Sequence, residues 1–130
     1  MSTEIRIASF PLAFETESII GAALEVHKNL GNGFLEVVYK DALEYEFYLS
    51  NLSYQREKEY PVFYKEVILK HKFYADFILL NTVVVEIKAK DEIADEDLAQ
   101  TINYLKCSNF KVGLILNFGR NKLEIKRVVL

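Results

Sequence analysis

Residues 73–88 read FYADFILLNTVVVEIK and predict two strands joined by a short loop. Both halves are rich in the aromatic and β-branched residues that favour strands, and the polar residues Asn81 and Thr82 lie between them. The unbroken apolar run at residues 83–85 is typical of a central strand that is covered on both faces. This stretch therefore predicts the middle of a sheet that carries helices on its two sides.

The length of the loop decides which side chains meet across this strand pair. If residues 80–82 form a three-residue loop, Leu79 faces Val83 and Asp76 lies directly opposite Glu86. A two-residue turn would instead send the side chain of Asp76 to the other face from Glu86. We expect the three-residue loop, because it places the two acids on one face.

Strand alternation puts Lys88 on the same face as Glu86. The opposite face is predicted to be apolar and to comprise Phe73, Ala75, Phe77, Leu79, Val83, Val85 and Ile87. Two carboxylates directly opposite each other repel, so something must offset the repulsion. A divalent cation would do so, with the Lys88 ammonium stabilising charge on a phosphate. The alternative is an ordinary surface ion-pair cluster.

The remaining elements follow from their periodicity. Apolar residues recur at helical spacing over residues 16–30 and 34–49, and Gly31-Asn32-Gly33 separates the two helices into a hairpin. Consecutive antiparallel strands are expected at residues 54–60, 62–69, 73–80 and 83–88, a helix at 96–107, and strands at 112–117 and 123–128. No repeat or linker divides the chain. We expect one domain over residues 1–130, of class α+β, with a mixed, largely antiparallel sheet flanked by helices.

Composition excludes several kinds of site and scaffold. The chain has 130 residues, of which 51% are apolar, and this is enough for a core without disulfides. Its single cysteine, Cys107, and its two histidines, His27 and His71, cannot supply a four-ligand zinc site. A metal would have to be bound by carboxylate oxygens, which suits Mg²⁺ or Mn²⁺.

Charge and hydropathy indicate the surroundings in which the protein works. No apolar run is long enough to span a membrane, and residues 1–6 lack the apolar core of a signal peptide, so a cytoplasmic protein is expected. The net charge is −3, which argues against tight non-specific binding of duplex DNA by a monomer. Basic residues are concentrated after residue 50, where a phosphate-binding surface would lie.

Several motifs together resemble a known family. Residues 33–39, GFLEVVY, preceded by residues 19–27, IIGAALEVH, look like the GxxExxY protein family, which is placed in the PD-(D/E)XK nuclease-like superfamily. Ala75-Asp76 occupies the PD position, with alanine in place of proline, and residues 86–88 occupy the ExK position. Residues 100–104, QTINY, are similar to the QxxxY motif of RecB-like exonuclease domains. The resemblance covers roughly residues 16–120.

This resemblance implies a restriction-endonuclease-like core and a Mg²⁺-dependent nuclease, active on DNA or RNA. By the resemblance, Asp76 and Glu86 are metal ligands together with the main-chain carbonyl of Ile87, Glu36 holds the metal or its water, Lys88 positions the attacking water, and Gln100 supports the site. Because related folds also serve in binding, the alternative is a catalytically silent module that binds nucleic acid or a protein partner and self-associates.

Three residues have two possible roles each, one functional and one structural. Glu36 falls within the apolar arc of its helix, where its carboxylate either contacts a metal or interacts with the helix dipole. Tyr39 and Tyr104 either contact substrate or are buried aromatics with a polar tip. Gln100 and Tyr104 share one helix face, expected to lie opposite the Leu98, Ile102 and Leu105 stripe.

Overall fold

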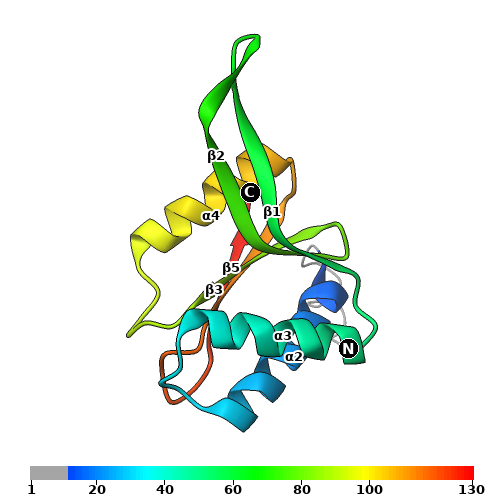
Figure 1. The fold of residues 1–130 in the computed structure, drawn as a ribbon, viewed down its shortest axis with the longest axis vertical. Coiled ribbons are helices and arrows are strands. Elements are labelled where there is room, and N and C mark those ends of the chain that lie inside the picture. Colours follow the sequence, from blue (N-terminus) through cyan, green and yellow to red (C-terminus); the bar gives the residue numbers. More distant parts are fainter. Residues whose placement is uncertain (1–11) are drawn as a thin grey trace, which may run out of the picture.

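A computed structural model describes residues 12–130, which form three helices and a five-stranded sheet (Figure 1). The elements are α2 (Ala13–Leu30), α3 (Glu36–Leu49), β1 (Tyr54–Tyr64), β2 (Val67–Leu79), β3 (Val83–Lys88), α4 (Asp95–Ser108), β4 (Val112–Asn117) and β5 (Glu124–Val129). The expectation about a signal peptide concerns residues 1–6 and lies outside the described residues.

The sheet is mixed, as the sequence predicted. Its strands follow the order β1-β2-β3-β4-β5, and β3 and β4 run parallel while the other neighbours are antiparallel. The chain crosses from β3 to β4 through α4, because parallel neighbours need a crossover connection. The α+β class with a largely antiparallel sheet is confirmed.

Helices cover both faces of the sheet, and each face has its own apolar cluster. The α2–α3 hairpin packs on one face with Phe77, Val85 and Leu114, whereas α4 packs on the other with Ile78 and Val84. β3 is buried over residues 83–87, which confirms the central covered strand. No helix within residues 12–130 is both long enough and apolar enough to cross a membrane.

β1 and β2 form one long hairpin that projects beyond the rest of the molecule (Figure 1). The separate strand expected at residues 62–69 is wrong, because the chain reverses at Lys65-Glu66 and Tyr64 pairs with Val67. Lys65 has a φ of 54°, a left-handed conformation that ordinary side chains rarely adopt. His71 lies within β2.

β2 exchanges faces near its middle, which the simple alternation of the sequence did not predict. Phe77 and Leu79 pack against the α2–α3 side, as expected, but Phe73 and Ala75 belong to the cluster beneath α4. The predicted apolar face is therefore divided between two cores. The change occurs at Asp76, which lies between the two sets.

The exchange coincides with a gap in the pairing of β1 and β2. Going along β1, Arg56 pairs with Phe77 and Lys58 with Ala75, so the position of Glu57 opposite Asp76 is missing from the ladder. Glu57 has a φ of 55°, a conformation that ordinary side chains rarely adopt. The face exchange of β2 therefore lies opposite an irregular residue of β1.

Gly119 lies against the segment that follows β3, and this close approach can be tested. A Cβ at Gly119 would collide with the backbone N, C and O of Lys90. We expect Gly119→Ala to lower the free energy of unfolding by about 1–3 kcal/mol, because backbone cannot move aside as a side chain can. Denaturant titration measures the effect.

Gly21→Ala provides the matched control, since Gly21 lies in α2 and a Cβ there meets nothing within 4 Å. This variant should gain about 0.5–1 kcal/mol through helix propensity. Equal stabilities of the two variants would contradict the packing described for residues 90 and 119.

Candidate metal and phosphate site at the β2–β3 divergence

Asp76 and Glu86 meet where β2 and β3 stop pairing. The register is the expected one, since Leu79 pairs with Val83 and the ladder extends to Phe77 opposite Val85. Beyond that pair, the backbone N–H of Asp76 donates to Glu86 Oε2 at 2.8 Å, and the N–H of Ile87 donates to Asp76 Oδ2 at 2.8 Å. Each carboxylate thus accepts a hydrogen bond from the opposite strand.

Glu86 is the more buried of the two acids, with 2% of its surface exposed. Burial raises the pKa of Glu86 well above its ordinary value, and the nearby Asp76 carboxylate raises it further. The hydrogen bond from the Asp76 backbone and the charges of Lys88 and Lys40 act in the opposite direction but do not cancel the increase. An ionised Glu86 is therefore unfavourable in the metal-free protein.

Asp76 has a direct cationic partner that the sequence did not indicate. The Lys40 ammonium lies 2.9 Å from Asp76 Oδ1 and 2.7 Å from Glu57 Oε1. Burial lowers the pKa of Lys40, but its hydrogen bonds with Glu57 and Asp76 outweigh this effect and raise it overall. Lys40 follows Glu36 by four residues, and this helical spacing is the signal that could have placed it at the site.

Glu36, the first residue of α3, belongs to the same electrostatic environment. Its pKa is raised first by burial and then by the Asp76 carboxylate, while Lys88 and Lys40 partly oppose the shift. The structure thus brings Glu36 close to Asp76 and Lys88, as predicted. A third carboxyl group accompanies the pair on β2 and β3.

Tyr39 lies in the core beneath this region and has no exposed surface. Its hydroxyl donates to the carbonyl of Gly31 at 2.6 Å and accepts from the N–H of Phe34 at 3.2 Å, and its ring stacks on Phe118. A substrate contact through Tyr39 is not compatible with this placement. The residue instead fixes the loop that leads into α3 and so positions Glu36.

α4 supplies the opposite wall of the site. Lys88 Nζ donates to Gln100 Oε1 at 3.2 Å and lies 3.8 Å from Asp97 Oδ1. Asp97 also accepts from Lys90 Nζ and from the N–H of Ala94, each at 2.8 Å. Burial raises the pKa of Asp97, but the Ala94 N–H and the two lysines outweigh it, so that pKa is lowered. Gln100 and Lys88 are brought together as predicted.

The buried face of α4 differs from the expected stripe. Leu98 and Ile102 are only partly buried, whereas Asp97, Thr101 and Tyr104 are buried beside Leu105. The predicted stripe missed Asp97 and Thr101 because their polar groups have partners in the folded chain: Asp97 accepts from Lys90 and from the Ala94 N–H, and the Thr101 hydroxyl donates to the Asp97 carbonyl.

Tyr104, expected on the opposite side of α4, faces the sheet and packs edge-to-face on Phe73. Burial raises the pKa of its hydroxyl, and the Glu86 and Asp76 carboxylates add to the shift. The Tyr104 hydroxyl is therefore influenced by the charges of the Glu86 and Asp76 carboxylates. The residue is mostly enclosed by protein, with 5% of its surface exposed.

Asn117 holds the chain immediately after β3. Its side-chain amide donates to the carbonyl of Lys90 at 2.9 Å, and its Oδ1 accepts from the N–H of the same residue at 3.0 Å. The amide also donates to Glu124 Oε1. The sequence did not predict Asn117 or Asp97 as site residues. In the sequence, Asn117 looks like the end of a strand and Asp97 like a residue that caps a helix.

The carboxyl groups are not yet arranged around an ion. Within residues 12–130, no three acidic, histidine or cysteine side chains gather at metal-binding spacing. Asp76 directs one oxygen to Lys40 and the other to the Ile87 amide. The donor set is nonetheless one of hard oxygens, and burial together with the Asp76 carboxylate raises the pKa values of Glu86 and Glu36.

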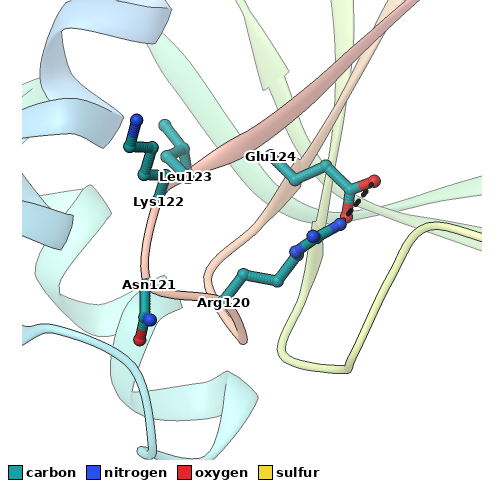
Figure 2. Close-up of a pocket in the computed structure, with 5 residues that line it drawn as sticks. All are labelled: Arg120, Asn121, Lys122, Leu123 and Glu124. Carbon is teal, nitrogen blue, oxygen red and sulfur yellow. Dashed lines mark ion pairs between the residues drawn. The ribbon is translucent and has the colours of Figure 1, made fainter.

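A separate hollow lies in the loop between β4 and β5 (Figure 2). It is lined by residues 120–124. Arg120 turns towards Glu124, with its guanidinium nitrogen 3.9 Å from Glu124 Oε2, while Lys122 points away. None of the predicted site residues lines this hollow. We therefore place the candidate site at the β2–β3 divergence.

The raised pKa of Glu86 predicts a pH-dependent effect of removing its charge. In metal-free buffer at pH 7, Glu86→Gln should raise the melting temperature, by about 3–6 °C for each kcal/mol gained in unfolding free energy. A raised carboxyl pKa costs stability above the pKa of the unfolded chain, because only the unfolded state loses its proton freely. The gain should vanish as the pH falls below the ordinary range of a glutamate.

Thermal unfolding of both proteins from pH 4 to pH 8 measures this difference. Glu66→Gln, in the exposed hairpin turn, is the matched control and should change little at any pH. A gain for Glu86→Gln that did not depend on pH would contradict the electrostatic explanation.

Comparisons with known proteins identify the family of the chain. Residues 14–128 match the family model of the PD-(D/E)XK nuclease superfamily, while no curated protein and no solved structure matches the chain. The match extends from α2 to β5 and so includes every strand and helix around the divergence. On this match over most of its length, the chain belongs to the PD-(D/E)XK nuclease superfamily.

Proposed function

We propose that this protein is a divalent-metal-dependent phosphodiester hydrolase that acts on DNA or RNA. The observation that supports this most strongly is the meeting of Asp76, Glu86 and Lys88 where β2 and β3 separate, between α3 and α4. Nucleases of this superfamily generally depend on divalent metals.

The proposed ligands of Mg²⁺ or Mn²⁺ are Asp76, Glu86, the main-chain carbonyl of Ile87, and Glu36 directly or through water. The chemistry supplied by a bound ion is polarisation of the phosphate and activation of a water molecule. The fit rests on three carboxyl groups in a partly buried region, two of which have raised pKa values. A bound divalent ion would neutralise these carboxylates and so lower the free-energy cost of keeping the three acids close together.

Lys88 is proposed to orient the attacking water and to stabilise charge on the phosphate. Its ammonium is held between Gln100 and Asp97, so it does not need to be ordered when substrate binds. Gln100 positions Lys88 through their hydrogen bond. Tyr104 remains a candidate substrate contact by its place beside Glu86, whereas Tyr39 is assigned only to positioning α3.

The β1–β2 hairpin supports nucleic acid as the substrate class. Phe63 and Tyr64 are exposed near its end, and Lys65 and Lys70 are exposed beside them. Exposed aromatic rings stack on bases and lysines contact phosphates. With a net charge of −3, binding by a single copy would be weak, and self-association would strengthen it. We propose action in the cytoplasm.

We further propose that the chain belongs to the GxxExxY group within the superfamily. The three residues of that motif have separate tasks: Gly33 adopts a φ of 107°, Glu36 opens α3 next to the site, and Tyr39 secures the loop. A side chain at Gly33 would be strained in this conformation. The motif thus supports the candidate site through the start of α3.

A catalytically silent binding module is the second candidate. One observation favours it: the oxygens of Asp76 are already used by Lys40 and by a backbone amide. If these contacts persist with a metal present, the site would bind nucleic acid through its lysines without cleaving it. The two candidates therefore differ in what happens when Lys88 is removed.

Lys88→Ala should reduce metal-dependent cleavage by on the order of 10²–10³-fold and leave binding of substrate nearly unchanged, because its ammonium acts mainly on the transition state. Cleavage of single-stranded and duplex DNA and RNA, with Mg²⁺, Mn²⁺ or EDTA, measures the first quantity. Salt-titrated binding of the same substrates measures the second.

Lys28→Ala is the matched control, because Lys28 is an exposed lysine on α2 and lies outside the proposed site. It should leave both quantities unchanged. A protein that binds but never cleaves, and whose binding loses about one counterion in Lys88→Ala, would support the binding module instead. Cleavage that persists unchanged in Lys88→Ala would remove Lys88 from the mechanism.

A further inference from the structure

Lys40 occupies the position beside Asp76 that a metal ion would require. Its ammonium lies 2.9 Å from Asp76 Oδ1, and the two side chains are 12% and 11% exposed. The other oxygen, Oδ2, accepts the Ile87 N–H. The oxygen of Asp76 that is not bonded to backbone is therefore covered by a positive charge.

Glu57 holds Lys40 in this position from the other side. Its carboxylate lies 2.7 Å from Lys40 Nζ and is about half exposed. Glu57 is also in a left-handed conformation within β1, opposite Asp76, where the strand ladder is interrupted. Such a conformation is unfavourable for a non-glycine residue and persists only when the surroundings compensate for it. The contact with Lys40 is a compensation that the structure provides.

An ammonium and a divalent ion against the same carboxylate oxygen repel each other, so the presence of one weakens the binding of the other. Lys40 has a flexible four-carbon stem and a second carboxylate, Glu57, that reaches towards solvent. The ammonium can therefore leave Asp76 and remain paired.

We propose that Lys40 is an exchangeable counter-ion of Asp76: it neutralises Asp76 in the metal-free protein and moves onto Glu57 alone when a divalent ion binds. This inference rests on the proposed function, because it assumes the metal site at Asp76 and Glu86. Its consequence is that Lys40 lowers metal affinity while stabilising the metal-free fold.

Lys40→Met tests the exchange by removing the charge and keeping most of the stem. The variant should bind Mn²⁺ on the order of 10-fold more tightly than the original chain, as measured by isothermal titration calorimetry without substrate. Its melting temperature in EDTA should fall by several degrees, because Asp76 is left beside Glu86 without a cation. Saturating Mn²⁺ should recover most of this loss.

Two further variants make the test specific. Lys58→Met removes the same charge from an exposed position of β1 and should change Mn²⁺ affinity by less than twofold. Lys40→Arg keeps the charge in a form that pairs bidentately with carboxylates, so it should bind Mn²⁺ no more tightly than the original chain. It also provides a folded variant if Lys40→Met is too unstable to measure.

The outcomes separate this inference from the function on which it rests. If the original chain binds Mn²⁺ and Lys40→Met binds it equally or more weakly, Lys40 is not a competitor and the metal site stands. Tighter binding by Lys40→Arg than by the original chain would also overturn the exchange. If Mn²⁺ binds to none of the three proteins, both the exchange and the proposed metal site are wrong.

Discussion

The hydrogen bonds between the carboxylates of Asp76 and Glu86 and the backbone of the opposite strand are the constraint on which the rest of the site depends. Buried backbone N–H groups need acceptors, and two strands that separate would normally leave such groups unpaired. Here Glu86 accepts the Asp76 N–H and Asp76 accepts the Ile87 N–H, both at 2.8 Å. The N–H groups of Asp76 and Ile87 therefore keep an acceptor where β2 and β3 diverge.

This divergence links the fold to the chemistry. β2 stops pairing with β3 at Asp76. Before this residue, its apolar side chains Phe73 and Ala75 face α4, and the β1–β2 hairpin extends away from the body (Figure 1).

The point where β2 and β3 separate lies between α3, which presents Glu36 and Lys40, and α4, which presents Gln100 and Asp97. The cations are held at the two walls by Glu57, Asp97 and Asp76, whereas Glu86 in the centre has no direct cationic partner among residues 12–130. Burial therefore raises the pKa of Glu86 well above its ordinary value, whereas the Ala94 N–H and the two lysines outweigh burial at the less enclosed Asp97 and lower its pKa.

The sequence predicted those parts of the structure that depend on local spacing. A three-residue loop fixes the β2–β3 register by counting, so the meeting of Asp76 with Glu86 follows from the sequence. The reversal at Lys65-Glu66 could not, because neither residue is typical of a turn and Lys65 must adopt a left-handed conformation there. The face exchange of β2 was equally hidden, since it coincides with an irregularity at Glu57 in a different strand. Lys40 and Asp97 were missed because each resembles an ordinary helix-surface charge until the sheet is placed beside it.

Helix geometry couples the two residues of α3 that act on the site in opposite ways. Glu36 and Lys40 are one turn apart on the same face, so any displacement of α3 moves both of them relative to Asp76. Glu36 adds negative charge that favours a cation, and Lys40 supplies a positive charge that competes with one. Tyr39 lies between them in the sequence and is anchored through Gly31, Phe34 and Phe118, which restricts such displacement. Since these contacts restrict the helix, the proposed exchange of Lys40 would proceed through its flexible four-carbon stem and not through a displacement of α3.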